Sequence, residues 1–495
     1  MSFLPITKEE MTKLGFDQMD FVCVTGDAYV DHPSFGMAII SRVLENAGYR
    51  VGIISQPQSD KDYMVFGKPR LAFMVSGGNI DSMVNHYTVA KRKRREDLYT
   101  PGGLSGKRPD RAVSVYTKNI KRIYHDSVVV IGGVEASLRR FAHYDYWDDK
   151  VLPSILVTSG ADVISFGMGE RQTRQIAKVL DQTNSPKALR AIDGVCYLAS
   201  KDELPSDFAE CSSFKKVSED KKSYAKATAV QIENQDAISG KIIVQKQDED
   251  LYLVQNKPQK ILSRKELDEV WELPFEKAYH PSYEKLGGVP AIKEVEFSIM
   301  HNRGCFGHCN FCSIAYHQGR QVSSRSIPSV LKEAEDMTKM PNFKGYIHDV
   351  GGPSANFRYP SCKKQEKFGL CTNRECLGDK PCPNLEIDHT EYTELLRKLR
   401  QIKGIKKVFI RSGIRYDYLI MDKDKGFFKD LVEHHVSGQL KVAPEHFSPK
   451  VLDLMGKPHI ELYKKFQKEY YELSKKAGKK QFLVPYLMSS HPGST

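Results

Sequence analysis

Strand-like and helix-like segments alternate along the first 190 residues, and this alternation constrains the fold more than any other feature. The apolar run DFVCVTG is followed by the helix-period stretch PSFGMAIISRVLENAGY and then by RVGIIS, and LAFMVSGG, SVVVIGG and ADVISFG repeat the pattern. Strands that are apolar throughout are typical of a parallel sheet covered by helices on both faces. We therefore expect residues 1–190 to form a doubly wound, Rossmann-like α/β domain with its ligand position at the carboxyl ends of the strands.

Residues 191–290 differ in character from the segment before them. They are polar and rich in lysine, and their β-prone pieces, such as GKIIVQ and LYLVQN, follow no clear period. We expect a linking region with a small irregular subdomain.

Alternation returns in residues 291–495. Strands are expected near residues 295–300, 344–350, 406–411, 438–442 and 480–485, with helical patterns between them. Repeated strands and helices with connections of this length are typical of a β/α barrel, whose chemistry lies on the loops after the strands. The sequence stops just beyond the last expected strand, so we expect a partial barrel that is truncated at its carboxyl end.

The composition indicates a globular protein without a membrane segment. Charged residues make up 27% of the 495 residues, and no uncharged apolar run is long enough to span a bilayer. The amino-terminal stretch MSFLPITKEEMTKLGF lacks the cationic start and apolar middle of a secretory signal, so a cytoplasmic protein is expected. In that reducing compartment, the seven cysteines from Cys305 to Cys382 are more often metal ligands than disulfide partners.

The stretch RGCFGHCNFC places Cys305, Cys309 and Cys312 at CxxxCxxC spacing directly after an expected strand. A structural zinc ion takes four protein ligands, and a catalytic zinc ion usually combines thiolates with histidine or carboxylate. A 4Fe–4S cluster has one iron at each of four corners, so three cysteines leave one iron for a ligand that is not protein. The spacing therefore favours a 4Fe–4S cluster with an open coordination position.

This stretch resembles the CxxxCxΦC signature of radical SAM enzymes, with Phe311 as the aromatic residue before the last cysteine. The resemblance implies that S-adenosylmethionine binds the free iron, and that its reductive cleavage yields a 5′-deoxyadenosyl radical. Nearly the whole chain resembles the YgiQ family of radical SAM proteins, through IGGVEASLRRFAHYDYW, DVGGPSAN, KVAPEH and SSHPG. That family implies an N-terminal α/β domain followed by a partial (β/α) radical SAM barrel, and a reductant such as flavodoxin or ferredoxin.

Four further residues are implied to bind the cofactor. Gly351 and Gly352 stand where the superfamily has its glycine-rich GGE segment, although Pro353 replaces the usual glutamate. Ser412 in FIRSGIRYD and Glu445 in KVAPEH follow later expected strands and offer polar groups to S-adenosylmethionine. No catalytic acid, base or nucleophile is distinguished by the sequence.

A second cysteine group lies in an insertion at residues 360–385. Its members are spaced by eight, four and five residues and are Cys362, Cys371, Cys376 and Cys382. Four thiolates complete a zinc site or hold an auxiliary iron–sulfur cluster. The irregular spacing, without the CxxC pairs of zinc ribbons, leaves free thiols as the alternative.

The loops of the N-terminal segment do not match two common cofactor motifs. TGDAYVDHPSFG, IGGVEAS and FGMGERQ contain neither GxGxxG nor a phosphate loop, so no nucleotide cofactor is expected there. Cobalamin-dependent relatives in the superfamily carry DxHxxG, whereas His32 stands at a different spacing from Asp31 and Gly36. No cobalamin ligand is expected either.

The charge of the chain supports a second class of function. The formal net charge is +12, and the densest basic run, KRKRRED, spans residues 91–97. Such a run is more often a solvated loop than a recognition surface, yet it permits RNA or another anionic partner. The alternative to an enzyme is therefore a non-catalytic metal-cluster protein that binds nucleic acid through the basic surface around residues 91–95.

Overall fold

The computed structural model describes residues 3–494, which fall into two compact units. The N-terminal unit comprises Met1–Lys260 and Glu272–Lys293, and the C-terminal unit comprises Ile261–Trp271 and Glu294–Thr495. Within residues 3–494, no helix has the length and apolar character needed to cross a membrane.

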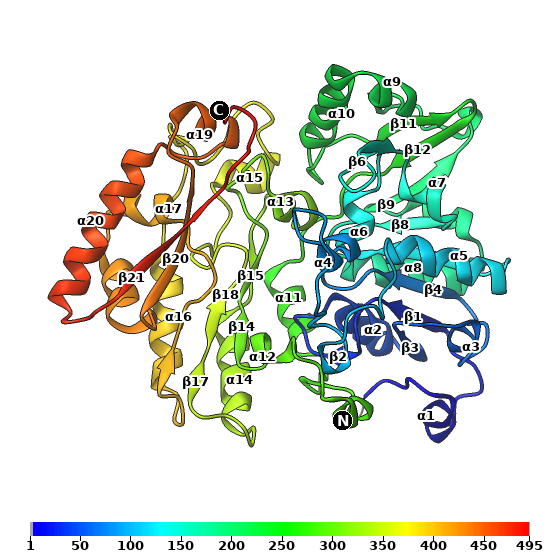
Figure 1. Cartoon of the computed structure of the whole chain (residues 1–495), viewed down its shortest axis with the longest axis horizontal. Coiled ribbons are helices and arrows are strands. Elements are labelled where there is room, and N and C mark those ends of the chain that lie inside the picture. The colour runs from blue at the N-terminus through cyan, green and yellow to red at the C-terminus, as the bar shows by residue number, and fades with distance from the viewer. Residues whose placement is uncertain (1–2, 495) are drawn as a thin grey trace. The chain divides into compact units, whose positions relative to one another are not determined.

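The N-terminal unit is built on a nine-stranded, mainly parallel sheet in the order β10-β11-β12-β9-β8-β5-β4-β1-β3 (Figure 1). Five parallel strands form the doubly wound part of this sheet: β3 (Val51–Ser55), β1 (Phe21–Thr25), β4 (Ala72–Ser76), β5 (Val128–Gly132) and β8 (Val163–Ser165). The chain passes from β1 to β3 on one side and returns to β4 on the other side. The predicted Rossmann-like sheet is thereby confirmed.

Two apolar cores cover the two faces of this sheet because alternate residues of each strand point in opposite directions. Phe21 and Cys23 of β1 belong to the core that includes α2 (Gly36–Asn46) and α8 (Glu170–Thr183). Val22 and Val24 belong to the core that includes α5 (Ala112–Ile123) and α7 (Ile155–Ser159). Burial on both faces explains why these strands read as continuous apolar runs.

The segment expected to be an irregular linking region extends the same sheet instead. Its strands are β9 (Val195–Ala199), β10 (Ala209–Cys211), β11 (Ile243–Asp248) and β12 (Leu251–Gln255), and β9 pairs antiparallel with β8. Buried glutamines hide the strand pattern: Gln245 accepts the backbone N–H of Ala142 at 2.8 Å, and Gln255 accepts Nε–H of Arg140 at 2.6 Å. The region reads as polar because these side chains satisfy backbone and arginine donors inside the unit.

The shorter elements of the N-terminal unit connect these strands. They are α1 (Lys8–Lys13), β2 (Val30–Asp31), α3 (Asp60–Tyr63), α4 (Ser82–His86), α6 (Gly133–Leu138), β6 (His143–Asp145), β7 (Lys150–Leu152), α9 (Phe214–Glu219), α10 (Lys221–Glu233) and β13 (Ala278–Tyr279). Helix α12 (Ile292–Val295) spans the sequence boundary between the two units.

The C-terminal unit has the repeated strands and helices of a partial β/α barrel. Parallel pairs form between β14 (Ser298–Met300) and β18 (Asp349–Gly351), β17 (Tyr346–Ile347) and β19 (Lys407–Val408), and β20 (Gln439–Glu445) and β21 (Phe482–Leu487). A backbone hydrogen bond from Val350 N–H to Phe409 O at 3.0 Å joins the first two pairs, and one from Ile410 N–H to His435 O, also at 3.0 Å, joins the segment after β19 to the turn that precedes β20. Each predicted strand of this region is present.

Helices lie before and between these strands in the sequence. They are α11 (Arg264–Trp271), α13 (Ser313–Gln318), α14 (Ile327–Thr338), α15 (Lys363–Phe368), α16 (Thr390–Gln401), α17 (Tyr416–Met421), α18 (Gly426–Asp430), α19 (Pro449–Met455) and α20 (Ile460–Lys476), with a π-helical turn at Leu431–His435. A short antiparallel pair, β15 (Asn302–Arg303) and β16 (Ser323–Ser324), flanks α13.

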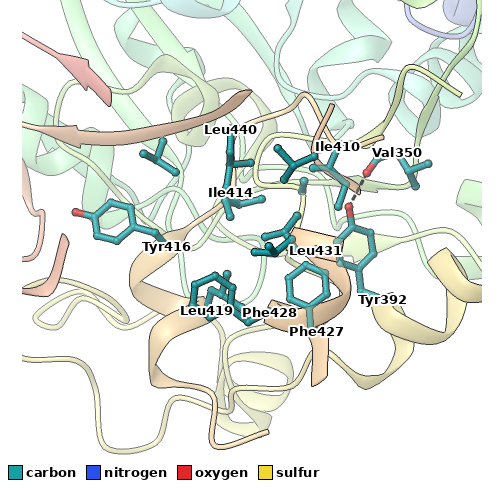
Figure 2. Packing of buried hydrophobic residues seen from close by; sticks show 14 of the residues in the cluster. Val350, Tyr392, Ile410, Ile414, Tyr416, Leu419, Phe427, Phe428, Leu431 and Leu440 are labelled. Carbon is teal, nitrogen blue, oxygen red and sulfur yellow. Dashed lines mark hydrogen bonds between the residues drawn. The ribbon is translucent and has the colours of Figure 1, made fainter. Parts of the chain in front are cut away.

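The core of the C-terminal unit lies between its strands and helices (Figure 2). Ile410, Leu440 and Phe428 are among its buried side chains. Tyr392 of α16 keeps its polar end satisfied by donating its hydroxyl to Val350 O of β18 at 2.6 Å. This bond ties a helix to the strand that precedes the GGP segment.

Candidate functional site

The three cysteines of CxxxCxxC lie on one loop between β15 and α13. Cys305, Cys309 and Cys312 are all partly exposed and unpaired as disulfides. Burial is the main cause that raises the pKa of Cys312, and the nearby charges of Cys309 and Cys305 raise it further. The loop therefore brings the three thiols close together.

The cysteine loop is anchored to α19 and to the end of the sequence. Asn310 donates its backbone N–H to Met455 O at 3.0 Å and its side-chain amide N–H to Leu454 O at 2.8 Å. Phe311 packs against the core, and its ring lies 6.1 Å from that of His491, edge to face. The aromatic residue of the signature thus has a packing role in the fold.

A buried arginine that the sequence does not single out lies against the thiols. Arg415 donates Nη1–H to Cys309 Sγ at 3.4 Å and Nε–H to Asp417 Oδ1 at 2.9 Å. Burial opposes its charge, but Asp417 and Cys309 outweigh burial and hold the pKa of Arg415 above its ordinary value. Gly307 permits this approach, because a Cβ there would collide with Arg415 Nη1.

A second buried cation, Lys457, lies near the same thiols. Its side chain is 4% exposed, and its Nζ is 4.0 Å from Oε1 of Glu445. Burial lowers the pKa of Lys457 and Arg415 adds to this, whereas the charges of Cys309 and Glu445 act in the opposite direction. The predicted cofactor residue Glu445 therefore stands beside a cation in the surroundings of the cysteine loop.

Glu445 ends β20 in an unusual backbone conformation. Its φ is +70°, in the left-handed region that favours glycine. A register shift in the β20–β21 pair occurs between Val442 and Glu445, and Met488 donates its N–H to Glu445 O at 2.7 Å. The bulge turns the strand end at this residue.

The predicted cofactor residues Gly351, Gly352 and Ser412 lie together at the ends of neighbouring strands, but the glycines serve packing within the chain. A Cβ on Gly351 would collide with Ser412 Oγ, and one on Gly352 would collide with Asn302 Oδ1. Both glycines therefore have a structural reason that is independent of S-adenosylmethionine.

Asp349 organises this corner and was not singled out by the sequence. The backbone N–H groups of Arg411 and Ser412 donate to its Oδ1 at 2.7 and 3.0 Å, and the Ser412 hydroxyl donates to Oδ2. Burial raises the pKa of Asp349 despite these donors. The signal was present in IHDVGG as a carboxylate at a strand end, directly before the glycines.

The second cysteine group lies around α15, in the insertion after β18. Cys376 Sγ donates to Ser361 Oγ at 3.2 Å, and Ser361 Oγ is 4.0 Å from Cys362 Sγ. The backbone N–H of Cys382 donates to Cys376 O at 3.1 Å. Three members of the group, Cys362, Cys376 and Cys382, are therefore close together.

The donor chemistry of the cysteine loop fits an iron–sulfur cluster. Thiolates are the ligands that such clusters take, and the cations of Arg415 and Lys457 offset their negative charge. No three His, Cys, Asp or Glu side chains in the described part of the chain are arranged to hold a single metal ion. A cluster does not require that arrangement, because each of its cysteines binds a different iron.

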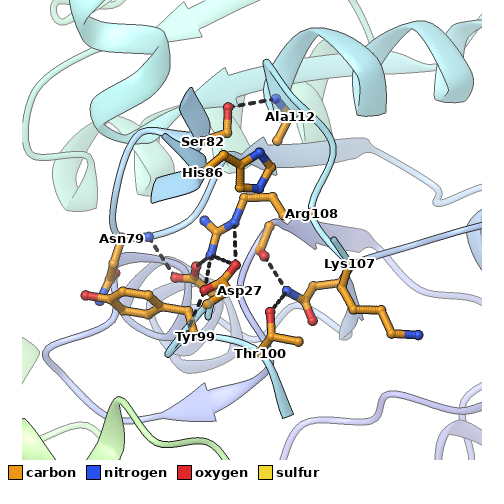
Figure 3. A network of polar contacts seen from close by, with 12 residues as sticks. Asp27, Asn79, Ser82, His86, Tyr99, Thr100, Lys107, Arg108 and Ala112 are labelled. Carbon is orange, nitrogen blue, oxygen red and sulfur yellow. Dashed lines mark hydrogen bonds and ion pairs between the residues drawn. The ribbon is translucent and has the colours of Figure 1, made fainter. Parts of the chain in front are cut away.

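A buried polar network lies in the segments that follow β1 and β4, at the carboxyl edge of the N-terminal sheet (Figure 3). Arg108 is buried there, with Nη2 2.7 Å from Asp27 Oδ1 and 3.3 Å from Asp97 Oδ2. Asn79 donates its backbone N–H to Asp27 Oδ2 at 2.7 Å. Burial raises the pKa of Asp27 to about 6, although Arg108 favours the ionised form. These charged side chains at the ends of β1 and β4 therefore have partners within the chain.

His32 and its neighbour Asp31 take part in contacts within the N-terminal unit. His32 Nδ1 accepts the backbone N–H of Ser34 at 3.1 Å, and Asp31 Oδ1 accepts Nε–H of Arg42 at 3.1 Å. Both residues are buried.

The basic run at residues 91–95 is an exposed loop between α4 and α5. Lys91 Nζ lies 4.9 Å from the ring centroid of Tyr146 and donates to Trp147 O at 3.2 Å. Tyr146 is itself exposed, so cations and an aromatic ring share this surface.

Comparison with known proteins places the chain in a family. Residues 3–298 match the family described as Radical SAM N-terminal. A UPF0313 protein of Clostridium perfringens (strain ATCC 13124) is 57% identical over 494 residues, which are 99% of this chain and 74% of that protein. A UPF0313 protein of Clostridium botulinum (strain Loch Maree) is also 57% identical, over 496 residues, which are 100% of this chain and 77% of that protein.

Two solved structures share the fold at low sequence identity. The radical S-adenosylmethionine methyltransferase TsrM from Kitasatospora setae, with tryptophan and a SAM analogue bound, gives a TM-score of 0.52 at 14% identity, covering 96% of this chain and 69% of its own. A structure of TsrM with cobalamin and a [4Fe–4S] cluster bound gives a TM-score of 0.51 at 13% identity. The match covers 97% of this chain and 68% of the TsrM chain. The chain therefore belongs to the radical SAM superfamily and, within it, to the UPF0313 family.

Proposed function

We propose that the chain is an enzyme that holds a 4Fe–4S cluster on Cys305, Cys309 and Cys312 and cleaves S-adenosylmethionine. When bound and reduced, this cluster supplies the electron that splits the sulfonium and releases a 5′-deoxyadenosyl radical for hydrogen abstraction from a substrate. The observation that carries the proposal is the gathering of three thiols on the loop after β15, with buried Arg415 beside Cys309. A flavodoxin or ferredoxin is the proposed reductant.

The surrounding side chains have roles that their contacts support. Arg415 keeps a positive charge against the thiolates, because Asp417 holds the guanidinium in place. Glu445 offers a carboxylate to the amino group or ribose hydroxyls of S-adenosylmethionine, and Lys457 beside it limits its negative charge. Asp349 fixes Ser412, and both lie next to Gly351 at the strand ends.

Anaerobic reconstitution with iron and sulfide tests the proposal. The protein should take up iron and sulfide, and addition of S-adenosylmethionine and dithionite should release 5′-deoxyadenosine. Cys309→Ser should abolish that release. Cys211→Ser is a matched control, because Cys211 lies in the N-terminal unit and its contacts with Ala227 O and Gln245 suit a serine hydroxyl. Release of 5′-deoxyadenosine by Cys309→Ser at the rate of the control would refute the assignment.

RNA is the substrate class that a specific observation favours. The exposed cations of residues 91–95 and the exposed ring of Tyr146 combine charge and stacking, as in sites for single-stranded nucleic acid. The same surface would serve a non-catalytic protein that binds nucleic acid. RNA binding that weakens steeply with salt, and that Arg92→Ala with Arg94→Ala reduces, supports this substrate class. RNA binding that is unaffected by those changes, compared with Lys226→Ala on α10, would exclude this surface as the RNA site, and absence of RNA binding by the unchanged protein would exclude the substrate class.

A further inference from the structure

The insertion after β18 carries a second group of thiols that the proposed cleavage of S-adenosylmethionine does not use. Three of these cysteines, Cys362, Cys376 and Cys382, are separated in the sequence of the insertion but lie close together in the fold. The thiols of Cys362 and Cys376 both contact Ser361 Oγ, and the backbone N–H of Cys382 donates to Cys376 O. The charges of Cys362 and Cys382 reach Cys376 and help to raise its pKa, of which burial is the main cause. The fold therefore holds three of the four sequence-predicted thiols near one another.

Backbone and side-chain hydrogen bonds fix the insertion in this arrangement. Gln365 of α15 accepts the N–H of Ser361 at 3.0 Å, and Glu386 donates its N–H to Ser361 O at 2.9 Å. Ser361 is 1% exposed, so the residue that contacts two of the thiols is itself immobilised by burial. Thiols held in place before any ligand binds lose little conformational freedom when they bind one.

One apolar cluster borders both cysteine groups. Its buried members are Phe306, Val322, Phe357, Leu377 and Tyr418, and Cys305 of the first group and Cys376 of the second both contact it. Phe306 and Phe357 stack with their centroids 3.8 Å apart. An apolar wall of this kind keeps water away from one side of each thiol group, which favours iron–sulfur chemistry over hydrolysis or oxidation.

Cys362 of the second group lines a cavity whose lining also includes two lysines. The cavity has a volume of about 500 Å³ and is lined by Cys362, Lys363, Lys364, Pro383, Asn384, Leu385 and Glu386. Cys376 also lies within reach of the charge of Arg320. Three thiolates on a cluster carry net negative charge, and these cations offset it.

We propose that Cys362, Cys376 and Cys382 hold a second 4Fe–4S cluster, whose fourth iron faces the lysine-lined cavity. Three thiolates leave a structural zinc ion one ligand short of its usual four protein ligands, whereas a 4Fe–4S cluster takes one cysteine per iron and can leave one iron to another ligand. The free corner then takes a small anionic or sulfur ligand from the cavity, with Lys363 and Lys364 supplying the complementary charge. Cys371 is not a ligand in this arrangement.

Iron and sulfide analysis of three anaerobically reconstituted full-length variants tests the proposal. Cys305→Ser/Cys309→Ser/Cys312→Ser should keep about four irons and four sulfides per chain, from the second cluster alone. Cys362→Ser/Cys376→Ser/Cys382→Ser should hold about four irons and four sulfides fewer than the unchanged protein. Cys371→Ser should match the unchanged protein at about eight irons per chain. If the second triple variant fails to fold by circular dichroism, the first variant still decides the question.

The outcomes separate this proposal from the proposed cleavage of S-adenosylmethionine. Iron retained by the variant of the first group supports the second cluster even if no protein releases 5′-deoxyadenosine. Loss of all iron and sulfide from that variant, or one zinc ion per chain without added sulfide, would overturn it. Loss of iron in Cys371→Ser equal to that in the second triple variant would also overturn the three-cysteine ligand set.

Discussion

The ion pair between Arg415 and Asp417 offers a quantitative test of the charge arrangement beside the thiols. The two side chains are 9% and 2% exposed, so both charges are removed from water. Arg415→Met keeps much of the apolar length of the side chain but leaves the Asp417 carboxylate without its main partner. Breaking a buried pair in this way costs about 3–5 kcal/mol. Arg415→Met should therefore lower the free energy of unfolding of the C-terminal unit by that amount.

Tryptophan fluorescence can isolate this unit. The chain has two tryptophans, and Trp271 of α11 belongs to the C-terminal unit. Trp271 is 7% exposed, and the Cζ atom of Arg303 lies 4.5 Å from its ring centroid. In a Trp147→Phe background, urea unfolding of the cluster-free protein followed by fluorescence reports on Trp271 alone. The free energy of unfolding is then compared among Arg415→Met, Asp417→Asn and the double variant.

The coupling between the two substitutions decides the matter. The double variant contains neither unpaired charge, so it should be less destabilised than the sum of the single variants by at least about 2 kcal/mol. A sum that agrees with the double variant within about 0.5 kcal/mol would show that the two charges do not depend on each other. The role given to Asp417 in holding Arg415 would then be wrong.

Two further substitutions test other parts of the molecule. Burial opposes ionisation of Asp20, but hydrogen bonds from Arg50 and Arg70 lower its pKa to about 2. Asp20→Asn should therefore lower the free energy of unfolding at pH 7 by about 1–2 kcal/mol, a value reduced for solvent screening because both arginines are partly exposed. The stability difference between Asp20→Asn and the unchanged protein should be full above about pH 4 and disappear as the pH falls toward 2. Thermal unfolding of the two proteins at pH 7, 4 and 3 measures this difference. A stability difference that stays constant with pH would exclude the charge effect. Gly307→Ala should displace Arg415 from Cys309, because the new Cβ would collide with Nη1 of Arg415. The variant then loses one charged hydrogen bond, worth about 1.5–3 kcal/mol, so the reconstituted protein should lose iron to a chelator about tenfold faster or more. Gly413→Ala, where a Cβ meets nothing within 4 Å, is the control, and equal rates for the two variants would contradict the contact.

The sequence predicted the elements that local patterns encode. Apolar runs buried on both faces, such as β1 and β4, are recognisable because their neighbours in the sheet do not alter the pattern. The β-prone pieces that form β11 and β12 were recognised, but their place in the main sheet was not, because Gln245 and Gln255 are buried through bonds to residues more than a hundred positions away. Polar residues satisfied by such distant partners cannot be told from surface residues in the sequence alone.

The candidate site divides in the same way. The cysteine spacing and Phe311 form a local signature, so they could be identified directly. Arg415 and Lys457 reach the thiols only after folding brings segments more than a hundred residues apart to the same place. The cofactor role of Gly351 and Gly352 stays a prediction, and the structure adds a packing reason for both glycines that the sequence could not show, because a Cβ at either position would collide with Ser412 or Asn302.

Backbone conformation links three loops of the C-terminal unit. Among its described residues, the non-glycine residues with positive φ are His308 at +46°, Glu445 at +70° and Ser490 at +62°. His308 lies between Cys305 and Cys309, Glu445 is paired with Lys457, and Ser490 precedes His491, whose ring packs against Phe311. A side chain in this region costs about 1 kcal/mol of local conformational strain relative to glycine. In the C-terminal unit this strain is concentrated on the loops around the thiols, where the side chains of His308 and Glu445 make ionic contacts that a glycine could not make.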